Sequence, residues 1–254
     1  MQHILIIGIG AGDPDHLTLQ AVKAIARTDV FFVLDKNEQR QDLIRLRRQL
    51  LDEHARPGHQ VVETPDAERD RGAPAYAAAV DDWRHRRADL VDRLIAEHLG
   101  PDQTGAFLVW GDPSLYDSVI AVVEEVLARR DAPDLFEYEV IPGISSISVL
   151  AARHRTTLTR VGRPFQVTTG RRLAEGFPEG VDDVVVMLDG QAAFAEIDPA
   201  GLDIHYGAYL GTPDEVLLSG PLAETAPRVL KARKAARDRK GWLMDTYLLR
   251  RSER

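Results

Sequence analysis

The sequence has 254 residues, of which 44% are hydrophobic and 28% charged, a composition typical of a folded globular protein with one or two cores. Its formal net charge of −8 argues against a general nucleic-acid or anionic-membrane surface, which needs a field of Lys and Arg. The absence of cysteine excludes disulfides, thiolate catalysis and Cys-based metal sites. The length favours two domains of roughly 120 residues each.

An apolar run over residues 4–9 opens the chain and stops at Gly10, and an Asp-Pro turn follows it. This run is too short and too strand-like for a signal peptide or a membrane helix. We therefore expect a cytoplasmic protein with no membrane partner and no nucleic-acid partner.

Apolar runs bounded by Gly, Pro or Asp alternate with helical periodicity along the first half, which predicts strands and helices in turn. The expected strands are residues 3–9, 30–35, 60–64, 106–110 and 137–141. The expected helices are residues 19–27, 42–51, 74–99 and 118–130. Such alternation predicts an α/β domain with a mostly parallel five-stranded sheet that helices cover on both faces.

The second half is less regular, and strands are expected at residues 165–168, 183–188, 204–210, 215–218 and 243–249. Helices are expected from Ser146, Gln191 and Pro221. The closeness of the strands around Thr212-Pro213 predicts a hairpin, and therefore a mixed sheet. We expect an N-terminal α/β domain over residues 1–142 and a C-terminal α/β domain over residues 143–254.

A glycine-rich loop, Gly8-Ile9-Gly10-Ala11-Gly12-Asp13-Pro14, follows the first strand, and its glycines allow the backbone to approach a ligand closely. A plain tight turn is the alternative. A nucleotide-cofactor oxidoreductase would also carry such a loop, with an acidic residue at the end of the second strand, as Asp35 is. The dinucleotide fingerprint G-x-G-x-x-G fails, however, because Asp13 holds the place of its third glycine.

Two further motifs lie at strand ends, where open α/β sheets bind ligands. Residues 110–116 (WGDPSLY) contain Asp112, which could accept hydrogen bonds from a ribose or an ammonium group, although Gly-Asp-Pro is also a common turn. Residues 142–146 (PGISS) open a helix, and their hydroxyls and free N–H groups could bind a carboxylate or simply cap that helix.

The set GIGAGDPDHLT, WGDPSLYDS and PGISS, in this order, resembles the tetrapyrrole (corrin/porphyrin) methylases. These are methyltransferases that use S-adenosylmethionine (SAM), with two α/β domains and an active site in the cleft between them. Residues 31–36, 68–71 and 243–249 make the chain most similar to the deacetylating members. The resemblance implies C1 methylation of precorrin-5 with release of acetate, giving precorrin-6A in cobalamin biosynthesis. It also implies a homodimer, and the chemistry requires no metal.

Position by position, the resemblance implies SAM contacts in several motifs. One wall of the cofactor pocket would be formed by Trp110, Gly111, Asp112 and Leu115. Ser145 and Ser146 would hold the methionine end, and Met187 would lie near the adenine. Two later motifs would contribute Leu210, Gly211, Trp242 and Leu243. A Met in an apolar strand is more often core packing than a ligand contact. Many relatives carry Pro where this chain has Ala11, so we expect the first loop to differ on the substrate side.

Removal of an acetyl group needs a general base for water and a donor for the oxyanion. The candidates for the base are Asp15, His16 and Asp35, and Tyr116 is the candidate donor. An Asp that follows Pro in a turn is more often a cap, so alignment of the reacting carbons is an alternative source of rate.

A macrocycle with many carboxylates suits arginines, which bind carboxylates through two hydrogen bonds. The candidates are the arginines after the third motif and near the sixth strand, namely Arg153, Arg155, Arg160, Arg163, Arg171 and Arg172. We expect the arginines of helix surfaces to face solvent instead, namely Arg84, Arg86, Arg87 and those of residues 231–240.

Three alternatives remain open at this point, because a fold alone does not assign a function. The same fold could methylate another precorrin carbon, a modified protein histidine or ribosomal RNA, and the acidic charge disfavours RNA. The oxidoreductase is a second alternative. A regulatory module that binds SAM without turnover is a third.

Overall fold

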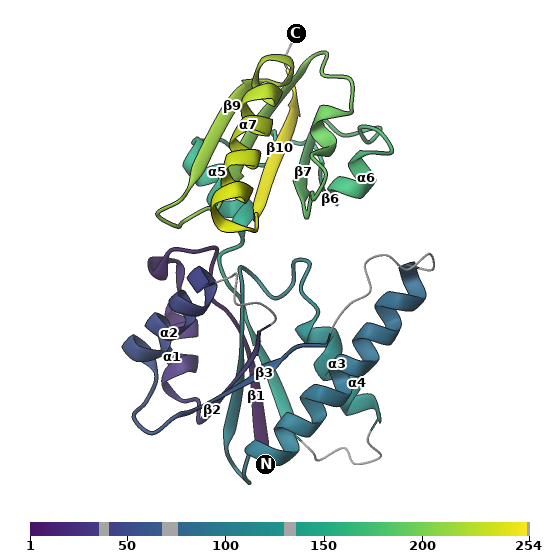
Figure 1. Ribbon diagram of the computed structural model, residues 1–254. Coiled ribbons are helices and arrows are strands. Elements are labelled where there is room, and N and C mark those ends of the chain that lie inside the picture. The colour runs from purple at the N-terminus through teal and green to yellow at the C-terminus, as the bar shows by residue number, and fades with distance from the viewer. Residues whose placement is uncertain (36–40, 68–75, 130–135, 253–254) are drawn as a thin grey trace. The chain divides into compact units, whose positions relative to one another are not determined.

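The computed structural model describes residues 1–35, 41–67, 76–129 and 136–252. It divides into two compact units, which we describe separately (Figure 1). Unit 1 consists of Met1–Gly10 and Pro14–Ile144, and unit 2 consists of Ala11–Asp13 and Ser145–Arg254. The domain ranges 1–142 and 143–254 stay a prediction. Lys36 and residues 68–71, which carry part of the family resemblance, lie outside the described residues.

Unit 1 contains a parallel five-stranded sheet in the order β3-β2-β4-β1-β5. Its strands are β1 (Gln2–Gly8), β2 (Val30–Asp35), β3 (Gln60–Pro65), β4 (Thr104–Val109) and β5 (Phe136–Ile141). The expected parallel sheet is thereby confirmed. Because the strands are parallel, the residues that follow β1, β4 and β5 meet at one edge of the sheet.

Helices cover both faces of this sheet, with α1 and α2 on one side and α3 and α4 on the other (Figure 1). The helices are η1 (Pro14–His16), α1 (Leu19–Ala26), α2 (Gln41–His54), α3 (Tyr76–His98) and α4 (Val119–Arg129). Thr18 begins α1, since its hydroxyl oxygen accepts a hydrogen bond from Ala21 N at 3.0 Å.

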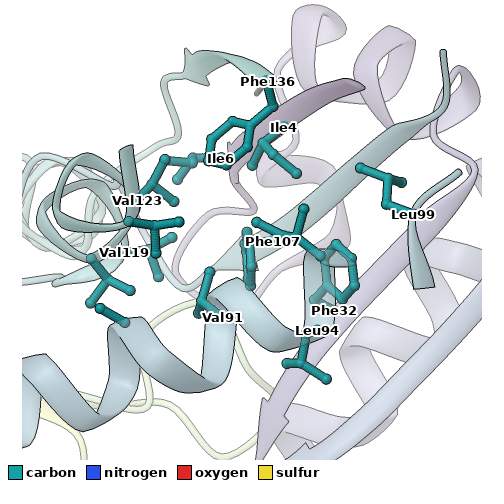
Figure 2. Close-up of a cluster of buried hydrophobic side chains, with 14 of the residues drawn as sticks. Ile4, Ile6, Phe32, Val91, Leu94, Leu99, Phe107, Val119, Val123 and Phe136 are labelled. Carbon is teal, nitrogen blue, oxygen red and sulfur yellow. The ribbon is translucent and has the colours of Figure 1, made fainter. Parts of the chain in front are cut away.

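The alternation of side chains along β1 explains the two layers of helices. Ile4 and Ile6 lie in the apolar cluster with α3 and α4, whereas Leu5 and Ile7 lie in the cluster with α1 and α2. Figure 2 shows the first cluster, in which side chains from the strands and from both helices converge. A strand that is apolar on both faces must be buried on both, as the sequence predicts.

Unit 2 contains a mixed five-stranded sheet in the order β6-β7-β10-β8-β9. Its strands are β6 (Phe165–Thr169), β7 (Asp183–Met187), β8 (Leu202–Ala208), β9 (Val216–Pro221) and β10 (Asp245–Arg251). Only β6 and β7 pair in parallel among these strands. The expected hairpin around Thr212-Pro213 is confirmed, because β8 and β9 are antiparallel neighbours.

The long helices of unit 2 cover opposite faces of this sheet (Figure 1). Its helical segments are α5 (Ser146–His154), α6 (Gly170–Leu173), η3 (Ala193–Ala195) and α7 (Leu222–Lys240). Tyr206 packs in the apolar cluster that includes Leu222 of α7, whereas a Cβ on the next residue, Gly207, would lie 2.9 Å from Leu150 of α5. Successive residues of β8 thus face different helices.

The prediction of a helix from Gln191 is wrong, because this segment forms only the three-residue 3-10 helix η3. The Asp189 carboxylate accepts hydrogen bonds from Gln191 N at 3.1 Å and from Ala193 N at 2.8 Å. Ala192 adopts a left-handed conformation with φ 65°, which an α-helix cannot contain. The side chain of Asp189 therefore organises a turn where the apolar pattern indicated a helix.

One edge of the sheet in unit 2 gathers several loops. β10 runs antiparallel to both β7 and β8, so Thr246 pairs with Met187 while Asp245 pairs with Ala208. The residues that follow β7 and β8 and those that precede β10 therefore lie at the same edge.

Candidate cofactor and substrate site

The parts of the three sequence motifs that lie in unit 1 meet through glycine backbone. A Cβ on Gly143 would lie 2.1 Å from the carbonyl oxygen of Gly111, and a Cβ on Gly8 would lie 2.5 Å from Gly143 N. Real side chains never approach backbone this closely, so only glycine fits at these two positions. We call Gly8, Gly10, Gly111 and Gly143 the glycine edge.

Gly10 and Gly111 complete the glycine edge with a two-residue bridge. Gly10 N donates to Gly111 O at 3.2 Å, and Gly111 N donates to Gly10 O at 2.8 Å. Both residues have positive φ angles, 80° and 71°, which favour glycine. The first and second motifs are thus joined, and the edge has the bare backbone that close ligand approach requires.

Asp112 ties the second motif to the third. Its Oδ2 accepts a hydrogen bond from Gly143 N at 2.9 Å, and its Oδ1 accepts from Ser114 N at 2.9 Å and from the Ser114 hydroxyl. Burial raises the pKa of Asp112, but the hydrogen bonds from Ser114 and Gly143 outweigh burial, so that its pKa lies below the ordinary value. The carboxylate therefore holds backbone in place, and its contact with a ligand stays a prediction.

Two buried polar atoms in unit 1 have no hydrogen-bond partner among the described residues, namely Trp110 Nε1 and His16 Nδ1. The indole N–H can only donate, and a buried donor without an acceptor is costly, so a ligand or an ordered water would satisfy it. His16 packs against the glycine edge, because a Cβ on Gly10 would lie 2.5 Å from His16 Cβ. Both residues are among those that the sequence predicted for the site.

The other predicted residues of unit 1 differ in how far they are buried. Tyr116 is 46% exposed and has a φ of 52°, an uncommon angle for a tyrosine. Leu115 is partly buried, and Asp15 is exposed. The side chain of Asp35 lies outside the described residues, although its backbone ends β2.

Ser145 and Ser146 begin α5 in unit 2. Ser145 is 8% exposed and is the N-cap of the helix, since its Oγ accepts a hydrogen bond from Ile147 N at 3.4 Å. Ser146 is the first helical residue and is partly buried. The hydroxyl of Ser145 thus has a capping role, and a role in holding the cofactor stays a prediction for both serines.

The later predicted segments lie in loops at the common edge of the sheet in unit 2. The ring of Tyr209 contacts the ring of Trp242 edge-on at 5.1 Å, and its hydroxyl donates to the Trp242 carbonyl oxygen. Gly211 N donates to Glu215 Oε2 at 2.9 Å. Leu210 is 4% exposed, while Met187, Gly211, Trp242 and Leu243 are partly buried.

Sequence reasoning missed Leu188, which follows β7. It has a φ of 54° and is 66% exposed, so a large apolar side chain is held in a left-handed conformation and leaves the core. The Asp-Gly pair after it was the available signal, since such pairs mark turns.

The tip of the first loop packs within unit 2. A Cβ on Gly12 would lie 2.6 Å from the carbonyl oxygen of Leu210 and 2.7 Å from Thr212 Cγ2, and Ala11 is 3% exposed. Ala11, which stands where many relatives carry Pro, is therefore buried beside a segment that the sequence assigned to the cofactor. Its effect on the substrate side stays a prediction.

Four of the arginines predicted to bind substrate carboxylates form ion pairs within unit 2. The pairs are Arg153 with Glu215, Arg160 with Asp183, Arg163 with Asp182, and Arg172 with Glu175. Arg155 ends α5 in a left-handed conformation, and Arg171 is exposed. A carboxylate of a ligand would therefore have to share most of these arginines with an acidic side chain.

The prediction that the arginines of helix surfaces face solvent is wrong for Arg233, which is buried, and for Arg87, which is largely covered. Arg87 of α3 is 11% exposed and pairs with Asp66, itself 8% exposed, at 2.9 Å, and Arg233 of α7 is 3% exposed and pairs with Asp245. The prediction holds for Arg84 and Arg86, whose ion pairs are exposed. A single sequence does not show which residue of a polar helix faces the sheet.

The comparisons with known proteins give a consistent result. A family model described as Tetrapyrrole (Corrin/Porphyrin) Methylases matches residues 3–226, which is most of the chain. The chain belongs to this family. The resemblance inferred from the three motifs is thereby confirmed, and the oxidoreductase alternative is not retained.

One relative and one solved structure are similar to nearly the whole chain. "Precorrin-6A synthase [deacetylating]" of Sinorhizobium sp is 46% identical over 252 residues, which cover 99% of this chain and 96% of that protein. The crystal structure of a putative cobalamin synthesis related protein (CobF) of Corynebacterium diphtheriae has a TM-score of 0.85 with 37% identity, and all of both chains is covered.

A solved structure of lower identity shares the fold. A uroporphyrin-III C-methyltransferase of Thermus thermophilus, solved in complex with S-adenyl homocysteine, has a TM-score of 0.59 with 20% identity and covers 97% of this chain and 96% of its own. At this identity the likeness concerns the fold alone. No group of three or more His, Asp or Glu residues that could hold a metal ion occurs in the part of the chain that the structure describes.

Proposed function

We propose that this methylase is a SAM-dependent precorrin-6A synthase of the deacetylating type, which converts precorrin-5 to precorrin-6A. The observation that carries the proposal is 46% identity over 99% of the chain to a protein of that name. The glycine edge and the two unpartnered polar atoms beside it fit a methylase that binds its cofactor through bare backbone.

The residues that we propose to hold the cofactor are those of the family motifs, namely Trp110, Gly111, Asp112, Leu115, Ser145, Ser146, Met187, Leu210, Gly211, Trp242 and Leu243. When bound, SAM supplies an electrophilic methyl group for an in-line displacement. The tasks of the protein are to align the accepting carbon with that group and to exclude water from the displacement.

The deacetylating reaction balances without an oxidant or a metal. Water adds to the carbonyl carbon of the acetyl group, the bond between that carbon and C1 of the macrocycle breaks, and acetate leaves. The electron pair of the broken bond stays on the macrocycle and forms the new bond from C1 to the methyl carbon. A base must therefore accept a proton from water, and a donor must stabilise the oxyanion.

Among the candidates for these two roles, we propose His16 as the base and Tyr116 as the donor. The Nδ1 atom of His16 is buried beside the glycine edge with no hydrogen-bond partner among the described residues, so in the tautomer that carries its proton on Nε2 it can accept a hydrogen bond from water. Burial raises the pKa of Tyr116 above its ordinary value, so its hydroxyl stays protonated at neutral pH and can donate. Asp15 and Asp35 remain alternative bases.

The test is to incubate the purified protein with SAM and precorrin-5 and to measure methylated product and acetate together. We expect one acetate for each methyl group transferred. Methylated product without acetate would contradict the deacetylating reaction and would favour methylation of another precorrin carbon. A protein that binds SAM without turnover would be a regulatory module instead.

We also propose that the enzyme is a homodimer that works in the cytoplasm without a resident metal. Light scattering that gives the mass of a single chain would contradict the dimer, and subcellular fractionation tests the location. Loss of activity after treatment with a chelator would contradict the absence of a metal. Within the described residues, no helix is long and apolar enough to span a membrane.

A further inference from the structure

The loop that follows β7 has an unusual conformation that its own sequence does not favour. Leu188 has a φ of 54°, and left-handed geometry is unfavourable for any residue with a Cβ. Its side chain is 66% exposed, so burial of the side chain does not compensate for the strain. Other groups must therefore hold this conformation in place.

An arginine on α7, which covers one face of the sheet, binds the backbone of this loop. Arg233 is 3% exposed, and its Nη2 donates to the carbonyl oxygen of Asp189 at 2.6 Å, while its Nη1 pairs with the Asp245 carboxylate. One turn further along α7, Arg237 Nη2 donates to the carbonyl oxygen of Gly190 at 2.6 Å. Two consecutive carbonyl groups of the loop are thus fixed by charged donors.

The Asp189 side chain holds the same loop from the other direction. It is 4% exposed, and its Oδ2 accepts hydrogen bonds from the Tyr247 hydroxyl at 2.6 Å and from Ala193 N at 2.8 Å. A Cβ on Gly170 would lie 2.4 Å from Asp189 Cγ, so the backbone of the first residue of α6 packs directly on this carboxyl group.

We propose that Asp189, Arg233 and Tyr247 form a clamp that positions residues 187–190 for the methyl donor. We call these three residues the β7 clamp. The inference rests on the proposed function, in which Met187 is a cofactor contact. None of the three residues touches the cofactor in this proposal, so they are positioning residues. They keep Leu188 in its left-handed conformation and thereby fix the backbone around Met187.

A role in stability alone does not account for this arrangement. Buried ion pairs contribute little net stability compared with apolar residues of the same size, because removing charges from water is costly. The polar groups of the clamp instead converge on a single loop, at the edge of the unit 2 sheet where the proposed cofactor segments that follow β8 and precede β10 also lie. Such a network specifies one conformation of the loop.

The test compares two tyrosines of the same sheet. Tyr247 and Tyr206 are both 0% exposed, and each donates its hydroxyl to a buried carboxylate, Tyr247 to Asp189 and Tyr206 to Asp245 at 2.9 Å. Only the bond of Tyr247 ends on the loop. Replacement by Phe removes one hydrogen bond in each case and keeps the ring, so the two variants should lose similar thermal stability.

We expect Tyr247→Phe to weaken the affinity for S-adenosylhomocysteine about tenfold by calorimetry, the effect of one hydrogen bond to a charged group. Tyr206→Phe should keep the wild-type affinity within about twofold. Equal affinities of the two variants would overturn the clamp. A wild-type protein that binds no S-adenosylhomocysteine would overturn the proposed function itself, and the two failures are therefore distinguishable.

A second pair of variants keeps the test decisive if Tyr247→Phe does not fold. Arg233→Lys retains the charge but cannot bind Asp189 O and Asp245 together in the same geometry. Arg228→Lys, at an exposed position of the same helix, is its control. We expect faster amide exchange of residues 188–190 and weaker ligand affinity in Arg233→Lys alone, and unchanged exchange would overturn the clamp.

Discussion

The glycine edge of unit 1 and the β7 clamp of unit 2 arrange backbone at a strand end by opposite means. At the glycine edge, side chains are absent, and Gly8, Gly111 and Gly143 bring three strand ends into backbone contact. At the β7 clamp, buried polar side chains of Asp189, Arg233 and Tyr247 hold one loop. The first arrangement tolerates no added atom, whereas the second depends on particular hydrogen bonds.

This difference determines how each region should respond to substitution. At the glycine edge, a small addition creates a steric clash with backbone, which cannot move aside without disturbing the sheet. At the clamp, the loss of one polar group leaves another buried and unpaired, and the loop can then relax. We therefore expect the largest losses of stability at the glycine edge and the more selective losses of binding at the clamp.

The largest effect should come from Gly143→Ala. Its Cβ would lie 2.1 Å from the carbonyl oxygen of Gly111, and the other near atoms are backbone as well. We expect the free energy of unfolding to fall by about 4 kcal/mol or more, measured by urea denaturation. Gly58→Ala is the control, since φ is 80° there but no atom lies within 4 Å, and about 1 kcal/mol is expected. Equal losses in the two variants would contradict the steric argument.

A smaller loss should follow from Arg87→Met. Arg87 pairs with Asp66 at 2.9 Å, stacks on Trp83 and donates to the Ser118 hydroxyl, so its removal takes the positive charge of this ion pair away from a nearly buried carboxylate. We expect a loss of about 3 kcal/mol in unfolding free energy. Arg84→Met, whose pair with Asp81 is exposed, should lose no more than about 0.5 kcal/mol. A similar loss in both would show that the Arg87 pair is not buried in solution.

Much of the fold follows from local patterns in the sequence. The alternation of Ile4, Leu5, Ile6 and Ile7 predicts a strand buried on both faces, and the structure has helices on both. The glycines of three motifs predict where backbone must approach closely, and three of them are in mutual contact. These signals are local, because a glycine or an apolar period can be recognised in the sequence without identifying the residues that it contacts.

The two arginines that sequence reasoning misplaced depend on partners elsewhere in the chain, whereas the turn that it missed depends on a local hydrogen bond of a side chain. Arg87 and Arg233 resemble any arginine of a polar helix, and their carboxylate partners are 21 and 12 residues away. The helix predicted from Gln191 does not form because the Asp189 carboxylate accepts hydrogen bonds from the local backbone. The apolar pattern that predicted the helix contains no information about these bonds. The clamp could be found only after the strands were in register.

Lowering the pH should reduce the stability that the Asp112 carboxylate contributes by joining the second and third motifs. The hydrogen bonds of Asp112 hold its native pKa below the ordinary value, so the native state binds fewer protons than the unfolded state in acid. The stabilisation is therefore present above about pH 4 and is lost as the pH falls through the native pKa. We expect the stability advantage of the wild type over Asp112→Asn to shrink between about pH 5 and pH 3. Ser114→Ala, which retains the hydrogen bond from Gly143 N to Asp112, should have a stability between those of the wild type and Asp112→Asn. A stability difference between the wild type and Asp112→Asn that does not depend on pH would contradict this account.

The smallest effect on stability should come from Tyr116→Phe, because the side chain is 46% exposed. We expect a change within about 0.5 kcal/mol in unfolding free energy and unchanged affinity for S-adenosylhomocysteine. If the hydroxyl is the oxyanion donor, acetate release should nevertheless slow by about 100-fold in single-turnover measurements, since one such donor contributes at least that much. Because neither folding nor binding changes, this loss would report on the hydroxyl alone. A rate equal to that of the wild type would instead assign the donor to another group. The candidate nearest to Tyr116 in sequence is the indole N–H of Trp110, which has no hydrogen-bond partner among the described residues.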